Sequence, residues 1–335
     1  MARSGGRRRR SARADALRVL RISDGDLELV ERDRPSPVGD EVLVEVAGSG
    51  VNRADLIQRA GRYPAPPGAP PDVAGLEFSG TVVGRGPGVR SLQDGDRVFG
   101  ILGGGGHATH VLTREPLCAA VPASLDLVEA GGIPEVFVTA HDALFVRAGL
   151  RPGERVLIHG VGSGVGTAAV QLAHAFGAET IGTSRTADKL ERAAPLGLDE
   201  GVLADDDMAA RIGEVDVVLD LVGGPYVATD VAVCRSKGRV VVVGLLAGSS
   251  VHLDLGRVMR NRLTIMGTVL RTRPDHEKAA ATEAFAREVV PLLERKALRP
   301  VIERVLPLQR GAEAYDLVRS DGTFGKVVLE PGGRG

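Results

Sequence analysis

The second half of the chain alternates short apolar runs with stretches in which apolar residues recur at helical spacing. The apolar runs predict buried strands over Arg155–Gly160, Glu179–Ser184, Val215–Val222, Arg239–Leu246 and Leu263–Leu270. The helical spacing predicts helices over Gly166–Phe176, Asp188–Leu196 and, longer than these, Glu277–Leu293. Because alternating strands and helices are typical of a parallel sheet covered on both faces, we expect an α/β fold with a doubly wound parallel sheet.

The first half has a different pattern, in which Gly and Pro residues interrupt short apolar segments. We expect strands over Ala16–Ile22, Leu27–Val30, Glu41–Val46, Thr81–Gly84 and Arg97–Gly100. The stretch Pro64–Pro71 is too rich in proline for a strand and predicts a stiff surface connection. Val301–Leu329 returns to short strands and one short helix. This pattern predicts an irregular β domain beside the α/β domain.

Composition and charge narrow the class of protein. A chain of 335 residues is too long for one ordinary core and favours two domains. The net charge of −1 gives the body no general attraction to nucleic acid, and no apolar stretch approaches the roughly 20 residues that cross a bilayer. The two distant cysteines, Cys118 and Cys234, exclude a Cys-rich structural zinc site and favour a cytoplasmic location.

The first 16 residues have no apolar periodicity and contain the like-charge run Arg7–Arg10. Such a run predicts a disordered basic tail. The segment also lacks the apolar region of a secretory signal and the apolar face of an amphipathic targeting helix. The run is the only feature of the sequence that suggests nucleic acid, and we do not expect such a partner.

A predicted strand runs into a glycine-rich turn and then into a predicted helix over Arg155–Gly166. This context favours a dinucleotide-binding loop over a chance cluster of glycines. The loop residues Gly162, Ser163, Gly164, Val165 and Gly166 are expected to line the cofactor, with its phosphates at the helix N-terminus. The spacing departs from the strict fingerprint at Val161 and Ser163, so the Ser163 hydroxyl or N–H is expected to face the cofactor. The alternative is a tight turn without a ligand.

The end of the second α/β strand distinguishes NADPH from NADH. A site specific for NADH usually has an acidic residue there, which bonds the ribose 2′-hydroxyl. This chain has Ser184 and Arg185 instead, with Lys189 four residues later. A guanidinium and an ammonium suit a 2′-phosphate, so we predict NADPH. The alternative is that Arg185 is only a solvated surface charge.

Several motifs resemble the quinone oxidoreductases of the medium-chain dehydrogenase/reductase superfamily. The motifs are Gly50–Ile57, Gly61–Pro64, Gly75–Gly80, Gly95–Val98, Ile133–Ala140 and Gly325–Leu329. The likeness is greatest to the ζ-crystallin-like and tumour-suppressor-inducible quinone reductase branch. It implies a GroES-like substrate domain interrupted by a Rossmann domain. The implied ranges are 17–134 for the GroES-like domain, 135–270 for the Rossmann domain and 271–335 for the return to the substrate domain.

The same resemblance implies chemistry without zinc. Zinc alcohol dehydrogenases of the superfamily have a Cys where this chain has Asn52 and a His where it has Leu76. Without thiolate and imidazole ligands a catalytic Zn²⁺ is not held. His107 and His110 lie together in a Gly-rich turn but have no third ligand nearby in sequence. We therefore expect no metal and predict NADPH-dependent reduction of a quinone by direct hydride transfer.

The resemblance also implies roles for residues outside the loop. Asn52 is expected to bond the nicotinamide ribose or the substrate oxygen, Tyr63 to line the quinone site and Thr139 to bond the nicotinamide amide. For each, the alternative is an ordinary structural role: a turn asparagine, a packed aromatic and a helix hydroxyl bonded to its own backbone. The remaining residues expected near the cofactor are Gly244, Leu245, Leu246, Val269, Leu270 and Lys326.

Two rival functions stay open at this point. One is an enoyl-thioester or alkenal C=C reductase, which uses the same cofactor and scaffold but a different acceptor. The other is a non-catalytic NADPH-binding protein, since a fold does not fix an activity. The resemblance implies a homodimer, formed through edge strands around Leu263–Leu270.

Overall fold

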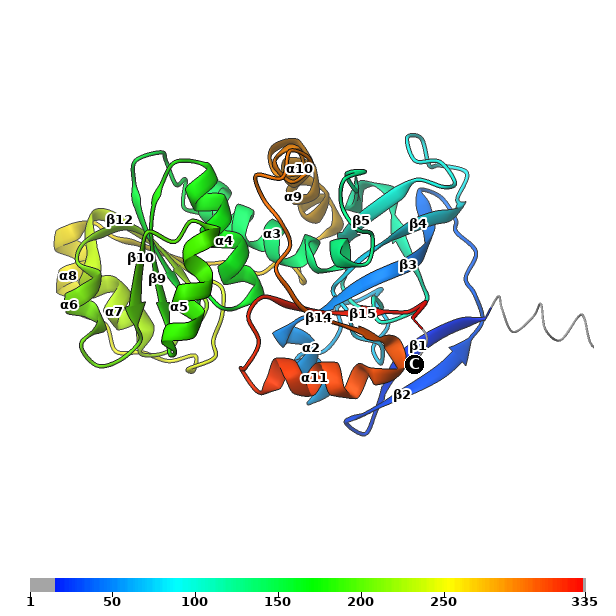
Figure 1. The fold of residues 1–335 in the computed structure, drawn as a ribbon, viewed down its shortest axis with the longest axis horizontal. Coiled ribbons are helices and arrows are strands. Elements are labelled where there is room, and N and C mark those ends of the chain that lie inside the picture. Colours follow the sequence, from blue (N-terminus) through cyan, green and yellow to red (C-terminus); the bar gives the residue numbers. More distant parts are fainter. Residues whose placement is uncertain (1–15, 334–335) are drawn as a thin grey trace, which may run out of the picture.

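The computed structural model describes residues 16–333, so the predicted basic tail lies almost wholly outside the described residues. Figure 1 shows two lobes side by side, one around a parallel sheet and one around a mixed sheet, with α3 (Pro134–His141) between them. No helix in the described part of the chain is long and apolar enough to cross a membrane. The α/β class and the two-lobed plan are therefore confirmed, while the residue boundaries of the domains stay predictions.

The first lobe contains a six-stranded parallel sheet with helices on both faces. Its strand order is β10-β9-β8-β11-β12-β13, the doubly wound order of a Rossmann sheet. The strands are β8 (Arg155–His159), β9 (Glu179–Ser184), β10 (Glu200–Leu203), β11 (Val215–Asp220), β12 (Cys234–Val242) and β13 (Thr264–Gly267). The helices are α4 (Gly164–Ala175), α5 (Ala187–Ala193), α6 (Met208–Ile212), α7 (Tyr226–Val233) and α8 (Leu255–Asn261).

The second lobe is a seven-stranded mixed sheet to which the C-terminal segment returns. The strands are β3 (Glu41–Val51), β4 (Glu77–Arg85), β5 (Arg97–Ile101), β6 (His110–Arg114), β7 (Cys118–Ala120), β14 (Ile302–Pro307) and β15 (Lys326–Glu330). β15 pairs antiparallel with β3, with Val327 opposite Val51. This register places the start of β15 beside the end of β3, which is where α2 (Arg53–Arg59) begins.

Two sequence predictions need correction. The helix expected over Glu277–Leu293 is divided into α9 (Asp275–Glu288) and α10 (Val290–Glu294), because Pro291 has no N–H for the helical ladder. The predicted strand Arg239–Leu246 is β12, which begins and ends earlier, at Cys234 and Val242. The strands expected over Ala16–Ile22 and Leu27–Val30 are confirmed as β1 (Leu17–Ser23) and β2 (Asp26–Arg32), which form a two-stranded hairpin.

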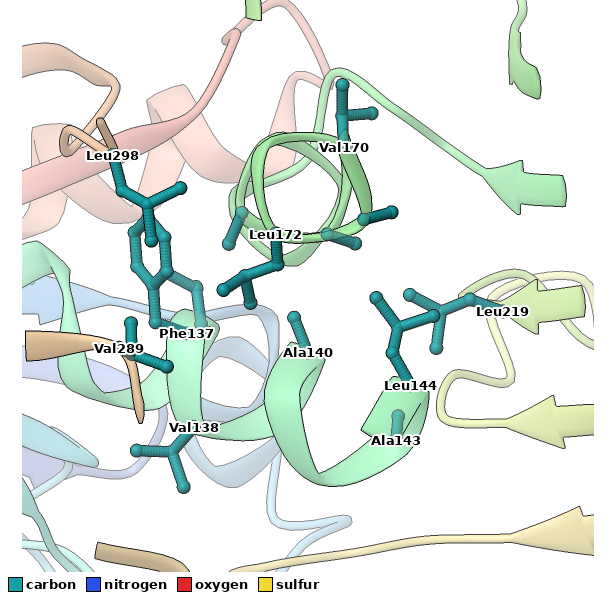
Figure 2. Close-up of a cluster of buried hydrophobic side chains, with 14 of the residues drawn as sticks. Phe137, Val138, Ala140, Ala143, Leu144, Val170, Leu172, Leu219, Val289 and Leu298 are labelled. Atoms are coloured by element: carbon teal, nitrogen blue, oxygen red, sulfur yellow. The ribbon is translucent and has the colours of Figure 1, made fainter. Parts of the chain in front are cut away.

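A shared core fixes α3 against the parallel-sheet lobe. Figure 2 shows Phe137 and Ala140 of α3 facing Leu172 of α4, and Leu144 of the following π-helical turn near Leu219 of β11. These side chains are at most 2% exposed. Burying side chains of this size stabilises the packing by roughly 1.5–3 kcal/mol each for the large apolar residues. α3 is therefore held rigidly between the lobes, and it carries two residues of the site described below.

Candidate active site

The glycine-rich loop joins β8 to α4 in a tight turn. Gly160 has a φ of +70°, and a Cβ on Gly166 would lie 2.3 Å from the Gly160 carbonyl oxygen. Ser163 is the N-cap of α4, and its hydroxyl accepts a hydrogen bond of 3.0 Å from the Gly166 N–H. The Ser163 hydroxyl therefore caps the helix, which is the usual role of serine at this position, and its O–H remains able to donate to a ligand.

Two lysine side chains of this chain approach the other glycines of the loop. A Cβ on Gly162 would lie 2.5 Å from the Lys189 side chain, and one on Gly164 would lie 2.6 Å from that of Lys326. The first turn of α4, including Gly164 and Val165, has N–H groups without intrahelical acceptors. Such N–H groups and the helix dipole suit a pyrophosphate, so the loop fits a dinucleotide at the start of α4.

A buried charge cluster lies below the loop. The Lys326 ammonium, at the start of β15, is 2.7 Å from Oε1 of Glu77 at the start of β4. It also donates to the Val51 carbonyl oxygen at 3.1 Å and to Asn52 Oδ1 at 2.6 Å. Lys326 is 4% exposed and Glu77 fully buried. The cluster requires a glycine at position 50, because a Cβ on Gly50 would lie 2.2 Å from Glu77 Oε1.

Asn52 joins this cluster through both ends of its amide. Nδ2 donates to Glu77 Oε1 at 2.9 Å and to the Gly50 carbonyl oxygen at 3.3 Å, and Oδ1 accepts from Lys326. Because the amide has two N–H donors and an oxygen with two lone pairs, only one acceptor position of Asn52 is left for a ligand. The sequence suggested Asn52 as an independent contact, whereas the structure shows it bonded to two buried charges.

Glu135 lies one residue into α3 and was not recognised as a site residue from the sequence. Its backbone N–H donates to Glu77 Oε2 at 2.9 Å. Burial, and after it the charge of Glu77, raise the pKa of the Glu135 carboxyl to about 8. The sequence offered one weak signal: Glu135 is the only acidic residue in Ile133–Ala140. Strongly perturbed carboxyls in a pocket are candidates for acid–base chemistry.

A pocket of about 130 Å³ opens beside these residues, at the carboxyl ends of the parallel strands. It brings together four residues predicted from the sequence, namely Tyr63, Thr139, Val269 and Leu270. The other lining residues are Ala54, Leu76, Glu135, Asp142, Val243, Thr268 and Arg271. Ligands in open α/β sheets bind at such an edge, so this pocket is the candidate active site.

Arg271 fixes Tyr63 on the wall of the pocket. Its guanidinium carbon lies 4.6 Å from the centre of the Tyr63 ring, and Nη1 donates to the Tyr63 carbonyl oxygen at 3.2 Å. Further hydrogen bonds reach the Gly103 carbonyl oxygen at 2.9 Å and Gln58 Oε1 at 2.5 Å. A buried guanidinium with these partners holds the ring by cation–π attraction and holds its backbone as well.

Ser184, Arg185 and Lys189 lie at and just after the end of β9 and do not line the pocket. Arg185 is 70% exposed and pairs with Asp321 Oδ2 at 2.9 Å, while the Lys189 ammonium donates to the Asp321 carbonyl oxygen. Arg53 contacts the other carboxylate oxygen of Asp321. Asp321 is thus an anion already present among the cations expected to bind a phosphate, and no sequence motif predicted it.

Gly244, Leu245 and Leu246 follow β12 but do not line the pocket. Gly244 packs so closely that a Cβ would lie 2.2 Å from the Leu221 carbonyl oxygen, whereas the Leu245 and Leu246 side chains are 58% and 60% exposed. The preceding residue, Val243, lines the pocket instead.

The donor set of the site does not fit a zinc ion. In residues 16–333, no three His, Cys, Asp or Glu side chains are placed to hold a metal. Glu77 bonds an ammonium, and the neighbouring positions are occupied by Asn52 and Leu76. His107 is buried with Nδ1 3.0 Å from the Tyr315 hydroxyl, and burial lowers its pKa.

Comparisons with known proteins place this geometry in a family. One family model, described as an alcohol dehydrogenase GroES-like domain, matches residues 39–147, and another, described as a zinc-binding dehydrogenase, matches residues 164–287. A quinone oxidoreductase from Sus scrofa is 31% identical over 327 residues, which cover 94% of this chain and 97% of that protein.

Two solved structures share the architecture. An alcohol dehydrogenase superfamily protein from Novosphingobium aromaticivorans is 32% identical with a TM-score of 0.83, over 94% of this chain and 99% of that one. The CurK enoyl reductase is 26% identical with a TM-score of 0.80, over 94% and 98% of the two chains. The chain therefore belongs to the medium-chain dehydrogenase/reductase superfamily, is an oxidoreductase of it, and has quinone oxidoreductases as near full-length relatives.

Proposed function

We propose that this protein reduces a quinone with NADPH by hydride transfer that uses no metal ion. The observation that carries the proposal is the pocket itself, in which Tyr63 and apolar side chains stand beside a charge cluster neutralised by Lys326. The family uses a nicotinamide cofactor, which supplies the hydride. A quinone is electron-poor, so the protein needs to align it and support the charge that develops on its oxygen.

Different residues of this chain suit different parts of the cofactor and the acceptor. The loop over Gly162–Gly166 and the start of α4 suit the pyrophosphate, because free N–H groups and the helix dipole favour an anion there. Thr139 lies on α3 at the pocket wall, within the region where the nicotinamide must reach the acceptor. Asn52 keeps one free acceptor position, which suits a ribose hydroxyl. Tyr63 offers an aromatic face against which a flat acceptor ring can stack.

The preference for NADPH rests on the end of β9. The strand ends at Ser184 without a carboxylate of its own, and Arg185 and Lys189 follow with Arg53 nearby. A 2′-phosphate placed among these cations would take over contacts that Asp321 now makes. An unphosphorylated ribose offers no charge that could replace Asp321.

A second candidate function is reduction of an activated C=C bond in an enoyl thioester or alkenal. The similarity to the CurK enoyl reductase favours it, because that protein shares fold and length with this chain. The lining of the pocket, in which apolar side chains stand beside Tyr63 and Glu135, does not distinguish the two acceptor classes. The two functions differ only in the acceptor, so a comparison of acceptors separates them.

The test follows NADPH oxidation by the purified protein with simple benzoquinones, naphthoquinones, short alkenals and enoyl thioesters. We expect the highest kcat/KM with a quinone and a lower value when NADH replaces NADPH. Faster turnover of an enoyl thioester would establish the second function. Binding of NADPH without reduction of any acceptor would show a non-catalytic protein and overturn both.

We further propose a homodimer formed through the open edge of the parallel sheet. β13 is the last strand of that sheet, and Leu255 and Met259 of the adjacent α8 are 72% and 74% exposed. Exposed apolar side chains beside an open strand edge favour a protein partner. Light scattering is expected to give the mass of two chains and, for Met259→Arg, a lower mass. A wild-type mass of one chain at micromolar concentration would contradict the dimer.

A further inference from the structure

Glu135 presents its carboxyl to the pocket without a partner of its own. The backbone N–H of Glu135 is bonded to Glu77, but the Glu135 side chain makes no hydrogen bond or ion pair with any residue of 16–333. The carboxyls of Glu77 and Asp55, by contrast, are fully engaged: Glu77 by Lys326, Asn52 and the Glu135 N–H, and Asp55 by the backbone N–H groups of Asn52 and Gly75. Asp142, which also lines the pocket, is bonded to Arg273 and Thr268. Among the carboxyls next to this pocket, the half-buried Glu135 is therefore the one available to a ligand.

The groups around Glu135 favour its protonated form. Burial is the largest influence, followed by the negative charge of Glu77, and together they raise its pKa to about 8. Asp55 acts in the same direction, while the cations Lys326 and Arg271 oppose them; the Tyr63 phenol also faces the carboxyl. A pKa about one unit above neutral means that roughly nine of ten molecules carry the proton at pH 7.

We propose that Glu135 is the proton donor of this pocket and passes its proton to the acceptor's carbonyl oxygen as the hydride arrives. The inference rests on the proposed function, because it concerns the same acceptor in the same pocket. Glu135 shares that pocket with Tyr63 and Thr139, so its carboxyl and the acceptor occupy one small volume. General acids of this kind are effective when their pKa lies near the working pH.

The step balances in atoms and electrons. The hydride from NADPH forms a C–H bond at a ring carbon of the quinone and leaves NADP⁺, while the C=C electron pair moves through the conjugated system onto a carbonyl oxygen. The O–H bond of Glu135 breaks, its electron pair stays on the carboxylate, and a new O–H bond forms on that oxygen. The product is the keto tautomer of the hydroquinone, which becomes the hydroquinone when the ring carbon loses a proton to water and the second oxygen gains one, and Glu135 regains its proton from water. With an activated alkene, the same proton goes to the enolate formed by hydride addition.

Tyr63 is the phenol of the pocket and the competing proton donor, and it is a weaker acid than Glu135. Burial raises the pKa of its phenol above the ordinary value of 10. At neutral pH a phenol of that kind gives up its proton far less readily than the Glu135 carboxyl. Its ring is also held against Arg271, which suits a wall that positions the acceptor.

The test compares Glu135→Gln with wild type across the range from about pH 6 to about pH 9.5. Gln keeps the size of the side chain but has no acidic proton. We expect kcat/KM for the quinone to fall about 100-fold at pH 7 while the Kd for NADPH changes less than about twofold. Wild type is expected to lose activity above about pH 8, where Glu135 loses its proton, and the variant to lack that fall. Glu129→Gln is the matched control, because Glu129 is an exposed carboxyl six residues earlier in the chain.

A second readout needs no cofactor or acceptor. The pKa of Glu135 is raised in the folded protein from the ordinary 4.5 to about 8. The contribution of this group to the stability of the folded protein is therefore fully present below about pH 4.5 and is lost as the pH rises through about 8. We therefore expect the Tm of Glu135→Gln to rise relative to wild type over that range. A Tm difference independent of pH would show that Glu135 does not hold the proton and would overturn the proposal.

The outcomes separate this proposal from the proposed function. If wild type reduces no acceptor, the proposed function fails and the donor role fails with it. If wild type reduces a quinone but Glu135→Gln keeps both the rate and the fall above about pH 8, only the donor role fails. Support would be strengthened by an acceptor series in which the loss in Glu135→Gln grows with the basicity of the acceptor oxygen.

Discussion

The candidate site has a buried inner end around Lys326 and Glu77 and an exposed outer end around Arg185 and Asp321, and the two ends hold their charges in opposite ways. At the inner end, Lys326 and Glu77 are almost fully buried, and each of their polar atoms has a partner. At the outer end, Arg185 and Asp321 are 70% and 40% exposed, and their contacts compete with water. The inner charges are costly to disturb, because an unpaired buried charge is strongly unfavourable. The outer charges are cheap to rearrange, because exposed ion pairs contribute about 0–1 kcal/mol.

This difference suits two tasks. A rigid, neutralised cluster keeps Asn52 and Glu135 in place beside the pocket, where reacting groups must hold their positions. A loose set of exposed charges can exchange one anion for another, as cofactor binding and release require. The two ends therefore differ in what a substitution should change, namely folding at the inner end and cofactor choice at the outer end.

The largest effect is expected from Lys326→Met, which removes the ammonium from buried Glu77. The free energy of unfolding should fall by about 3–5 kcal/mol, since a buried carboxylate then has no cation. Denaturant unfolding of wild type and variant measures this difference in the free energy of unfolding. The double variant Glu77→Gln/Lys326→Met is expected to be more stable than Lys326→Met alone, because the uncompensated charge is gone. A change within about 0.5 kcal/mol for Lys326→Met would show that the cluster is not as tightly coupled as its geometry indicates.

An intermediate effect is expected from Tyr63 and its support. Tyr63→Ala should raise the KM for the quinone about tenfold and change the Kd for NADPH less, because the ring faces the acceptor. Arg271→Met should give a similar rise, since Arg271 acts by holding that ring. Steady-state kinetics of the double variant Tyr63→Ala/Arg271→Met shows whether Arg271 acts through Tyr63 or independently of it. A loss equal to the product of the single losses would mean that Arg271 acts independently of Tyr63.

The smallest effects are expected at the outer end. Arg185→Glu should weaken NADPH about fivefold relative to NADH, and Asp321→Asn should tighten NADPH about twofold by releasing the cations. Fluorescence titration with each cofactor gives both Kd values. Arg319→Glu is the control, as an exposed arginine that pairs with Asp316 outside this cluster. An unchanged NADPH/NADH ratio in Arg185→Glu would remove Arg185 from the 2′-phosphate site.

The sequence predicted the parallel-sheet lobe better than the mixed-sheet lobe. The bounds of β9 agree with the prediction, because the strand lies between two predicted helices, with Gly177 before it and Arg185 directly after it. The strands β6 and β7 were missed, since they contain only five and three residues and Pro116 lies between them. Short strands held by their neighbours leave little periodicity to detect.

The site residues also divide into those that a local sequence pattern predicted and those that it did not. Gly162–Gly166 was visible as a local strand–loop–helix pattern, and Tyr63 and Thr139 were visible through motifs. The significance of Glu135 was not, because it depends on Glu77, which lies 58 residues earlier in the chain. Similarly, the contact between Asn52 and Lys326 spans 274 residues. Such contacts arise from the return of β15 to β3, which no local pattern encodes.

The most direct test of the central claim measures NADPH-driven quinone reduction and metal content in one preparation. The protein is dialysed against a chelator, its zinc is quantified, and its rate is compared with untreated protein. We expect full activity with zinc far below one ion per chain, because the site offers a Lys326–Glu77 pair where metal ligands are needed. Activity that falls with the chelator and returns on addition of Zn²⁺ would contradict it.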